Sequence, residues 1–508
     1  MFARALGTRV GLGLAATLLL PLGVRGQAVL GGEWRDDVAA FANRVIEADL
    51  TPGMGIAVTV GDWVVYEQGF GVADTDTGRP IEEHTAFYIA SSTKSLTGLA
   101  AALAVHNGDL ELDAPLTRYL PDARLPEGIA AETLTVRSLL ALTHGMAGAG
   151  PVVFRTAFSG EFTRSDLLRL LQHHEPNGSA GTFNYNNLGY NLVGLVLEAI
   201  YDQGWKEVVR DLVLDPLGMT RTTAYLSRLS QEALAMPHGV VPGEGFKRIR
   251  LAKDDSNLHA AGGHFATPGD LARYLAVHLG GGTIDGARVL PSEPVLMTRQ
   301  QQVAQDREFG PFHRFGWGIG WDLGSYEEDT LVHRFGAFGG YRSHMSFMPE
   351  HGLGVVVLVN GSGPASPAAD LMATYIYDRL LEKPEVEARH TMRLEELEEM
   401  AVQSLAGLGA HLAERRARLA PLPHPLETYA GIYENESYGR MEWRVVSSGL
   451  EVRIGLARSR VEVFDAAENL LRVELLGTGQ VVSFHIPVEG GPARSLTYLG
   501  AEFVRVEG

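Results

Sequence analysis

The pattern of apolar residues changes near residue 383, and this change limits the possible folds more than any other feature of the sequence. Before it, strand-like and helix-like segments are interleaved. Residues 56–60 and 63–66 are rich in β-forming residues and are separated by Gly61-Asp62, which predicts a hairpin. Residues 355–359 form another strong strand pattern near the end of this region. We therefore expect one sheet that is built from both ends of residues 27–382.

After residue 383 the sequence predicts one long helix followed by short strands. An apolar stripe with acidic residues on the other faces is typical of an amphipathic connecting helix, and its members are Leu394, Leu397, Ala401, Leu405, Leu408 and Leu412. Pro421, Pro423 and Pro425 end this helix. From residue 426 to 508, short alternating runs are separated by Gly or Asn turns, which predicts a small antiparallel β-barrel or sandwich. The predicted domains are therefore 27–382, a helical linker at 383–425, and a C-terminal β domain at 426–508.

Charge and composition exclude several classes of protein. The 508 residues include 61 acidic and 43 basic ones, a formal net charge of −18, and Lys and Arg form no run that could follow a phosphate backbone. We therefore expect no nucleic-acid partner. Hydrophobic residues make up 45% of the chain and charged residues 20%, as in soluble globular proteins. These values argue against a disordered chain and against a protein with several membrane spans.

Residues 1–26 have the layout of an export signal. Basic residues precede an apolar stretch from residue 10 to 23, and Val24 and Gly26 fit the −3 and −1 positions of a cut after Gly26. Pro21 interrupts the apolar stretch, which is shorter than the roughly 20 residues of a spanning helix, so an uncleaved anchor is the weaker alternative. The chain contains no Cys, which excludes disulfides and thiolate metal sites. We expect an exported protein, periplasmic or secreted, with no transmembrane segment in the mature chain.

A short motif at the start of a predicted helix carries the first chemical signal. Ser91 and Lys94 are three residues apart, which places both side chains on one helical face and within reach of each other. A serine hydroxyl needs a base to become a nucleophile, and a lysine kept neutral by burial can be that base. The helix N-terminus adds free N–H groups beside a developing oxyanion. The structural alternative is a capping serine followed by a surface lysine.

Two further segments contain residues that suit acyl transfer. Tyr185 can act as a general base if nearby cations lower its pKa, and an asparagine amide such as that of Asn187 can hold a substrate carbonyl. The alternative there is an Asn-rich turn with a packed tyrosine. Residues 333–341 contain Gly336, and a glycine edge lets a substrate backbone lie against a strand and offers a second oxyanion donor. The alternative at this segment is a β-bulge.

These motifs occur in the order found in the superfamily of serine β-lactamases, penicillin-binding proteins and family VIII esterases, which the chain resembles over about residues 35–382. The surrounding sequence is similar as well, namely Phe87-Tyr88-Ile89-Ala90, Leu139-Leu140-Ala141-Leu142-Thr143-His144-Gly145, Asp215-Pro216-Leu217-Gly218-Met219, Ala261-Gly262-Gly263 and Gly354-Val355-Val356-Val357-Leu358-Val359-Asn360. The resemblance implies an α/β (α+β) domain with an antiparallel sheet flanked by helices and a helical subdomain. The predicted all-β barrel follows this domain.

The resemblance also implies a role for each motif residue. Ser91 is implied to be the acylated nucleophile, Lys94 its base partner, and Tyr185 the base that activates the serine and later a water molecule. Asn187 is implied to orient the substrate, and the backbone N–H groups of Ser91 and Ala337 are implied to form the oxyanion hole. The tyrosine form of the second motif is similar to that of class C β-lactamases, D-aminopeptidases and related esterases.

The third motif departs from the family pattern, in which Lys or His stands two residues before the glycine. Here the spacing to Gly336 places Arg334 in that position, and His333 lies one residue earlier. Either side chain could supply the charge and contact the substrate. Since neither is interchangeable with Lys, a β-lactam antibiotic is the less favoured substrate.

We therefore expect an exported serine hydrolase that acts through an acyl-enzyme on Ser91, needs no cofactor or metal, and takes an ester or a D-aminoacyl amide of a short peptide. Two alternatives stay open. One is a non-catalytic protein of the same fold that binds peptides or cell-wall fragments, because a fold does not guarantee turnover. The other is a protein whose C-terminal barrel binds an apolar ligand and is itself the functional part.

Overall fold

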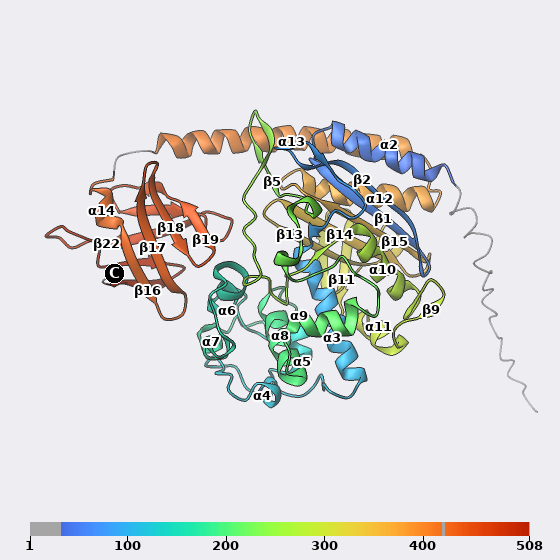
Figure 1. Cartoon of the computed structure of the whole chain (residues 1–508), viewed down its shortest axis with the longest axis horizontal. Helices are drawn as coiled ribbons and strands as arrows, with labels where there is room; N and C mark the ends of the chain where they lie inside the picture. The colour runs from blue at the N-terminus through green and yellow to red at the C-terminus, as the bar shows by residue number, and fades with distance from the viewer. Residues whose placement is uncertain (1–31, 419–421, 507–508) are drawn as a thin grey trace, which may run out of the picture.

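The computed structural model describes residues 32–418 and 422–506, so the export signal predicted at residues 1–26 lies outside the described residues. The described chain forms a larger α/β domain and a smaller β domain, and the long helix α13 (Val386–Ala417) runs from one to the other (Figure 1). In the described ranges, no helix combines the length and the apolar character that crossing a membrane requires.

A nine-stranded antiparallel sheet forms the centre of the larger domain. Its strands, in spatial order, are β10 (Val303–Phe309), β11 (Phe312–Trp317), β12 (Asp322–Tyr326), β13 (Asp329–Phe338), β14 (Tyr341–Met348), β15 (Leu353–Val359), β1 (Gly53–Val60), β2 (Trp63–Asp74) and β3 (Arg79–Pro80). Strands β1 and β2 form the expected hairpin, and β1 pairs with β15, with Ile56 opposite Val357. Both pairings confirm the prediction of one sheet built from the two ends of this region.

Helices cover both faces of this sheet. Every residue of β14 and β15 is buried, so these central strands have no side in contact with water. On one face lie α2 (Trp34–Glu47), α12 (Ala365–Leu380) and the start of α13, in a core that includes Phe41, Tyr375 and Val357. On the other face lie α10 (Pro268–Leu279) and α3 (Thr93–His106), in a second core that includes Leu275 and Leu358. Because alternate strand residues point to opposite faces, adjacent residues of β15 enter different cores.

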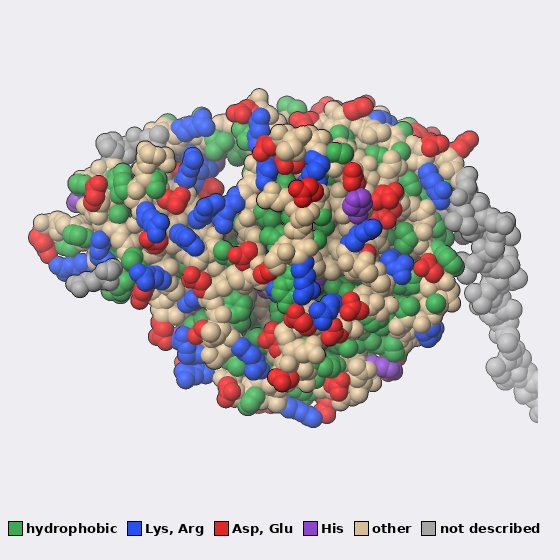
Figure 2. All heavy atoms as spheres, viewed as in Figure 1, with side chains coloured by type: hydrophobic (Ala, Val, Ile, Leu, Met, Phe, Trp, Pro, Cys, Tyr) green, Lys and Arg blue, Asp and Glu red, His purple; other side chains and the backbone are tan. Residues whose placement is uncertain are grey.

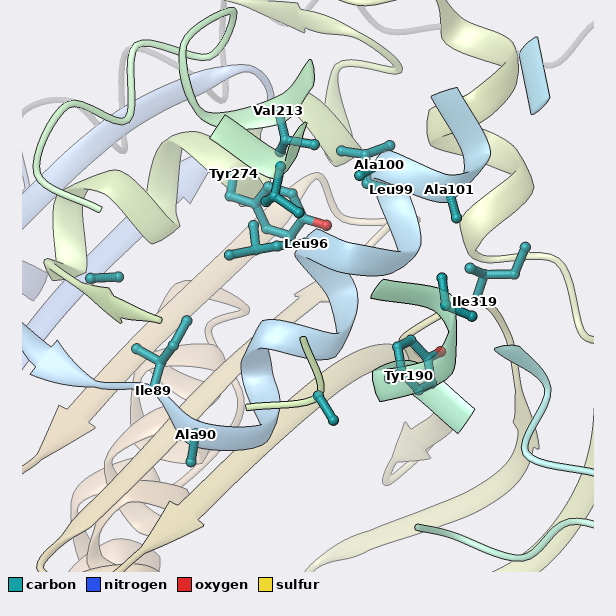
Figure 3. Close-up of a cluster of buried hydrophobic side chains, with 14 of the residues drawn as sticks. Ile89, Ala90, Leu96, Leu99, Ala100, Ala101, Tyr190, Val213, Tyr274 and Ile319 are labelled. Carbon is teal, nitrogen blue, oxygen red and sulfur yellow. The ribbon is translucent and has the colours of Figure 1, made fainter. Parts of the chain in front are cut away.

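Helix α3 is buried on nearly all sides. In Figure 3, Ala90 leads into this helix, and Tyr190, Tyr274 and Ile319 lie around it. Gly98 permits the close approach of the neighbouring chain, because a Cβ at this position would lie 2.8 Å from the carbonyl O of Ile319. A helix that is enclosed in this way is a core element, so the residues at its N-terminus have fixed positions.

A mostly helical region lies beside the sheet, in the lower half of Figure 1. Its helices are α4 (Leu116–Tyr119), α5 (Val136–Leu140), α6 (Pro151–Phe154), α7 (Arg164–Leu170), α8 (Leu188–Tyr201), α9 (Trp205–Val209) and α11 (Ser292–Thr298). Short strand pairs complete the domain: β4 (Phe87–Tyr88) with β7 (Phe265–Ala266), β5 (His238–Val241) with β6 (Gly245–Arg248), and β8 (Thr283–Ile284) with β9 (Ala287–Arg288). The β4–β7 pair fixes the chain directly before Ser91.

The C-terminal domain is a nearly closed antiparallel barrel, as predicted. Its strands, in spatial order, are β19 (Ala457–Arg460), β18 (Gly449–Ile454), β17 (Gly439–Val446), β16 (Gly431–Asn435), β24 (Ala501–Val506), β23 (Ser495–Tyr498), β22 (Gln480–His485), β21 (Leu470–Val473) and β20 (Glu462–Asp465), and the short helix α14 (Leu426–Tyr429) precedes them. Buried and more exposed residues alternate along these strands. On β18, Leu450, Val452 and Ile454 are buried, whereas Glu451 and Arg453 are more exposed.

The barrel contacts the larger domain directly. Phe154 of α6 belongs to the apolar core of the barrel, and its ring centroid lies 5.4 Å from that of Tyr438. The N–H of Leu456 donates a hydrogen bond to the carbonyl O of Ser159 at 2.9 Å. The two domains are therefore joined by apolar packing and by a backbone hydrogen bond as well as by α13.

Helix α13 buries side chains in the core of the larger domain over its first half. Val386, His390 and Leu394 are buried, whereas Val402 is 67% exposed and Leu408 is 37% exposed. The apolar stripe that predicts this helix therefore contributes to the core mainly at its N-terminal end. The second half of the helix carries the chain to the barrel with most of its surface in water.

Candidate active site

Ser91 lies where strand β4 passes into helix α3. A single 3₁₀ turn, Ala90–Ser92, connects the two elements. Ala90 has a φ of 44°, a left-handed conformation that residues other than glycine adopt rarely. Backbone strain of this kind persists only where the surrounding structure holds it, and it is frequent at functional sites. The turn places the half-buried side chain of Ser91 at the N-terminus of α3.

Lys94 is buried and hydrogen-bonds Ser91. Its Nζ donates to Ser91 Oγ at 3.2 Å, to Asn187 Oδ1 at 2.6 Å and to the carbonyl O of Ala261 at 2.8 Å. Burial lowers the pKa of Lys94 to about 8, although the nearby Tyr185 phenol opposes this shift. A lysine with this pKa is partly neutral near neutral pH. Its Nζ can therefore accept the proton of the serine hydroxyl.

A hydrogen-bonded turn places Tyr185 and Asn187 beside Lys94. His144 Nε2 and Asn186 Oδ1 lie 3.1 Å apart, and this contact ties the turn to the segment that precedes it in the helical region. Lys94 Nζ lies 5.0 Å from the centre of the Tyr185 ring, within the range of a cation–π contact. The segment is thus a polar turn before α8, as the alternative of an Asn-rich turn predicts. The same turn also places Tyr185 and Asn187 beside Lys94.

Arg334 is a second cation beside Tyr185. Its Nη2 donates to the Tyr185 hydroxyl at 2.9 Å. Burial alone would raise the pKa of the Tyr185 phenol, but the charges of Arg334 and Lys94, together with hydrogen bonds from Ser91 and Lys94, outweigh burial and lower this pKa. Adjacent cations favour the phenolate form. Tyr185 therefore meets the electrostatic condition for a general base.

The charge of Arg334 is compensated inside the protein. Its Nη1 donates to Asp322 Oδ2 at 2.8 Å, and both side chains are buried. Its guanidinium also lies 5.2 Å from the centre of the Trp317 ring. Because one terminal nitrogen bonds Asp322 and the other bonds Tyr185, the guanidinium is held in a single orientation. Arg334 is thus directed at the tyrosine.

The structure separates His333 from these residues. Successive residues of a strand point to opposite faces, so His333 lies on the other side of the sheet from Arg334. Its ring packs against Phe312 and Phe335, with centroids 5.6 and 4.4 Å away. Burial lowers the pKa of His333 well below its usual value, so the ring is neutral. The expectation that His333 contacts the substrate is therefore wrong, and Arg334 is the residue of this pair that reaches the site.

Gly336 lets strand β13 pass close to Ser91. A Cβ at this position would overlap the carbonyl O of Ile89 and would lie 3.0 Å from the Ser91 backbone nitrogen. β13 pairs with β14 without a register shift here, so the glycine does not mark a bulge. On its other edge β13 pairs with β12 as far as His333, and no described strand pairs with that edge beyond this point. The open edge runs beside Ser91, and the role of the Ala337 N–H as an oxyanion donor stays a prediction.

Serine hydroxyls fasten the 3₁₀ turn to the sheet. Ser343 Oγ, on β14, donates to the carbonyl O of Ile89 at 2.9 Å and lies 2.8 Å from Ser92 Oγ. Ser92 Oγ donates to the carbonyl O of Arg334 at 3.3 Å. These bonds hold the Ser91 turn against the same strand edge that carries Arg334. The site is therefore preorganised by groups that do not belong to the motifs.

An apolar cavity of about 550 Å³ lies between the barrel and the larger domain. Phe154 and Phe158 of the larger domain contribute to its lining, and Tyr438 and Leu476 of the barrel face them. The ring of Phe158 lies 6.5 Å from that of Phe338, at the end of β13. A row of aromatic rings thus leads from the β13 edge to a cavity that is large enough for an amino-acid side chain or a short acyl chain.

Several residues of the site carry no motif of their own. Asp322 holds Arg334, His144 holds the Tyr185 turn, and the carbonyl O of Ala261 accepts a hydrogen bond from Lys94. His144 and Ala261 lie in segments that support the family resemblance, so the sequence gives some signal for them. Asp322 gives none, because only the register of β12 on β13 places it beside Arg334.

The arrangement defines a class of protein. A serine at a helix N-terminus bonds a buried lysine, and a tyrosine between two cations lies beside them along the open edge of an antiparallel strand. These are the parts that a serine enzyme needs for acyl transfer. The family model described as Beta-lactamase matches residues 42–377, which is most of the larger domain. The chain belongs to this Beta-lactamase family of serine hydrolases, as the sequence motifs predict.

The individual relatives have low sequence identity to this chain but match more than half of its length. Penicillin-binding protein 4 of Amycolatopsis lactamdurans is 28% identical over 331 residues, which cover 63% of this chain and 84% of that protein. The octameric penicillin-binding protein homologue from Pyrococcus abyssi is similar in structure, with a TM-score of 0.58 and 21% identity over 93% of this chain and 100% of that one. D-amino acid amidase from Ochrobactrum anthropi SV3 has a TM-score of 0.58 and 22% identity over 69% of this chain and 99% of that one. Both solved structures share the fold of this chain.

Proposed function

We propose that this protein is an exported serine hydrolase that forms an acyl-enzyme on Ser91 and hydrolyses an ester or a D-aminoacyl amide. The hydrogen bond of 3.2 Å from Lys94 Nζ to Ser91 Oγ carries the proposal. The alternative of a surface lysine does not apply, since Lys94 is 0% exposed. Export is supported by the signal pattern at residues 1–26.

The chemistry follows from the positions of the proton acceptors. Ser91 Oγ attacks the substrate carbonyl carbon, and its proton passes to Lys94 Nζ or to the Tyr185 oxygen, whichever is unprotonated. The bond to the leaving group then breaks, the leaving group takes up that proton, and the acyl group stays on Ser91 Oγ. A water molecule, deprotonated by the same acceptor, attacks the acyl carbon. The bond from this carbon to Ser91 Oγ then breaks, Oγ takes up the proton from the acceptor, and the acid is released. The N–H groups of Ser91 and Ala337 stabilise the oxyanion in both steps.

Two features support an ester or a D-aminoacyl amide over a β-lactam. Asp322 and Tyr185 already engage both terminal nitrogens of Arg334, so its charge is not directed at a substrate carboxylate. The apolar cavity beside Phe158 suits an apolar substituent of the acyl group. The similarity to a D-amino acid amidase of the same fold agrees with the second substrate class. The substrate assignment rests on these contacts together.

Steady-state hydrolysis of three substrate classes tests the proposal. These are p-nitrophenyl esters of short and medium chain length, p-nitroanilides of D- and L-alanine, and a chromogenic cephalosporin. We expect turnover of an ester or the D-anilide to exceed that of the cephalosporin, and Ser91→Ala to abolish all turnover. A cephalosporin hydrolysed as fast as the best ester would overturn the substrate assignment. Binding of D-peptides without any turnover would favour the non-catalytic alternative.

A further inference from the structure

A second cavity between the two domains is lined mainly by arginine. Its volume is about 320 Å³, and its charged lining residues are Arg250, Arg444, Arg453, Arg458, Glu442 and Glu451. Arg250 belongs to the larger domain, and the other five belong to strands β17, β18 and β19 of the barrel. Figure 2 shows Lys and Arg side chains gathered over this part of the barrel. Such a cluster is unexpected in a chain with a formal net charge of −18.

Two of these arginines lie directly opposite each other. Arg453 on β18 pairs with Arg458 on β19 in the antiparallel ladder. Both are exposed, while their neighbours Ile454 and Ala457 are buried, so the guanidinium groups belong to the outer face of the barrel. Like charges at opposite positions of a strand pair destabilise a sheet. The Arg453–Arg458 pair therefore does not itself stabilise the strand ladder.

Arg250 adds a positive charge from the other domain. Its Nη2 donates to the carbonyl O of Leu456, in the turn between β18 and β19, at 2.9 Å. Partial burial lowers the pKa of Arg250, and the positive charges of Arg458 and Arg453 lower this pKa further. The same contact that joins the domains thus brings three positive charges together.

The acidic residues of this arginine cavity compensate these charges only in part, because four arginines and two glutamates line it. Glu442 lies opposite Arg453 in the strand ladder, but its carboxylate pairs with Arg444 at 2.6 Å. Glu451 lies opposite Arg444. Arg453 donates to the carbonyl O of Gly455 instead of to a carboxylate. Among the described residues, Arg250, Arg453 and Arg458 have no carboxylate within ion-pair distance.

We propose that the arginine cavity binds a phosphate group and thereby links the barrel to the larger domain. Guanidinium groups present planar pairs of N–H donors that match phosphate oxygens. A phosphate has enough oxygens to bond three guanidinium groups, whereas a single carboxylate has two oxygens. Free phosphate and a polyphosphate chain, whose terminal phosphate groups also have three free oxygens, share this chemistry. The site does not involve Ser91, so the inference is independent of the proposed hydrolase activity.

Isothermal titration calorimetry of the full-length protein with inorganic phosphate, at constant ionic strength, tests the site. We expect saturable binding to the wild type. Arg250→Gln and Arg453→Gln should each weaken it about tenfold or more, because each removes a charge-assisted hydrogen-bond donor. Arg494→Gln is the matched control, since this exposed barrel arginine pairs with Glu489 outside the cavity. It should leave phosphate binding unchanged.

The result from Arg250→Gln decides whether both domains form the site. Loss of affinity on changing either domain indicates a shared site. Circular dichroism and the melting temperature verify that each variant is folded, and the exposure of these side chains makes folding of the variants expected. No saturable binding to the wild type, or binding that survives both Arg250→Gln and Arg453→Gln, would overturn the proposal. A parallel titration with polyphosphate distinguishes a polymer, which would bind more tightly per phosphate group, from the free anion.

Discussion

Two lysines of the larger domain, Lys94 and Lys253, are both buried but have different partners. Burial lowers the pKa of Lys94 to about 8 and that of Lys253 to about 7. Lys94 Nζ donates to the side chains of Ser91 and Asn187. Lys253 Nζ donates to a backbone carbonyl, that of Ala157, at 2.7 Å. Both lysines therefore have a lowered pKa, but of the two it is Lys94 that contacts a serine hydroxyl.

The surroundings of Lys253 explain how a buried charge can be held without a reactive neighbour. Its Nζ lies 4.2 Å from the centre of the Phe338 ring, 5.7 Å from that of Tyr88 and 5.9 Å from that of Phe158. Aromatic faces stabilise a cation, and the carbonyl of Ala157 fixes its position. Of these groups only Tyr88 has a hydroxyl, and this hydroxyl donates to the carbonyl O of Gly262. Partners, more than burial, thus distinguish a catalytic lysine from one that packs in the core.

The largest expected difference between the two lysines is in catalysis. Lys94→Met should lower kcat/KM for the best ester by about 10²–10⁴-fold, because Ser91 loses its hydrogen-bonded proton acceptor. Lys253→Met is the matched control, since it removes the same charge from another buried position. It should lower kcat/KM by about tenfold at most. Steady-state kinetics measure kcat/KM of both variants, and melting temperatures verify that they are folded. An equal loss of kcat/KM in the two variants would show that Lys94 has no special role in catalysis.

A smaller difference is expected in the pH dependence of the reaction. Arg334 lowers the pKa of Tyr185 and of Lys94, and the proton acceptor must be unprotonated for Ser91 to react. Activity should therefore rise with pH through the pKa of the acceptor. Arg334→Met removes the positive charge, raises that pKa, and moves the rising limb of the kcat/KM profile to higher pH. Lys253→Met should leave the limb in place, and an unshifted limb in Arg334→Met would refute the electrostatic role.

The smallest expected effect is on stability. The pKa of Lys253 is 10.5 in the unfolded chain and about 7 in the folded one, so between these values the unfolded chain binds a proton that the folded protein does not. The stability of the wild type therefore gains a contribution as pH rises through this window. Lys253→Met lacks that contribution. Its free energy of unfolding relative to the wild type should fall by about 2 kcal/mol between pH 7 and 9.

Urea unfolding at several pH values measures this effect. Lys94→Met should show the same trend, beginning about one pH unit higher because the pKa of Lys94 is about 8. The two lysines would then differ in catalysis and agree in their effect on stability. Parallel stability curves for the wild type and Lys253→Met would show that folding does not lower the pKa of Lys253.

Some of the fold could be predicted from the sequence because the signals were local. The strand patterns at residues 56–60 and 355–359 are almost continuously apolar, and such strands need a place in the middle of a sheet. The Ser91–Lys94 spacing was also a local signal, since it depends only on the helix that contains it. Local periodicity therefore predicted the two ends of the sheet and the first motif.

Other parts could not be predicted because they depend on strand register. His333 and Arg334 are adjacent, and only the placement of β13 against Ser91 and Ser92 determines which of them faces the site. Arg453 and Arg458 are separated by four residues in the sequence, and the β18–β19 pairing alone makes them opposite neighbours. Such choices are made by tertiary contacts, so local patterns leave them undetermined.

The central claim is that Lys94 activates Ser91, and intact-mass spectrometry after exposure to a fluorophosphonate tests it most directly. The proteins compared are the wild type, Ser91→Ala, Lys94→Met and Lys253→Met. We predict one adduct on the wild type and on Lys253→Met, mapped to Ser91 by peptide analysis. Ser91→Ala should carry none, and Lys94→Met should react about 10²-fold more slowly. An adduct on Ser91→Ala, or labelling of Lys94→Met at the wild-type rate, would contradict the account.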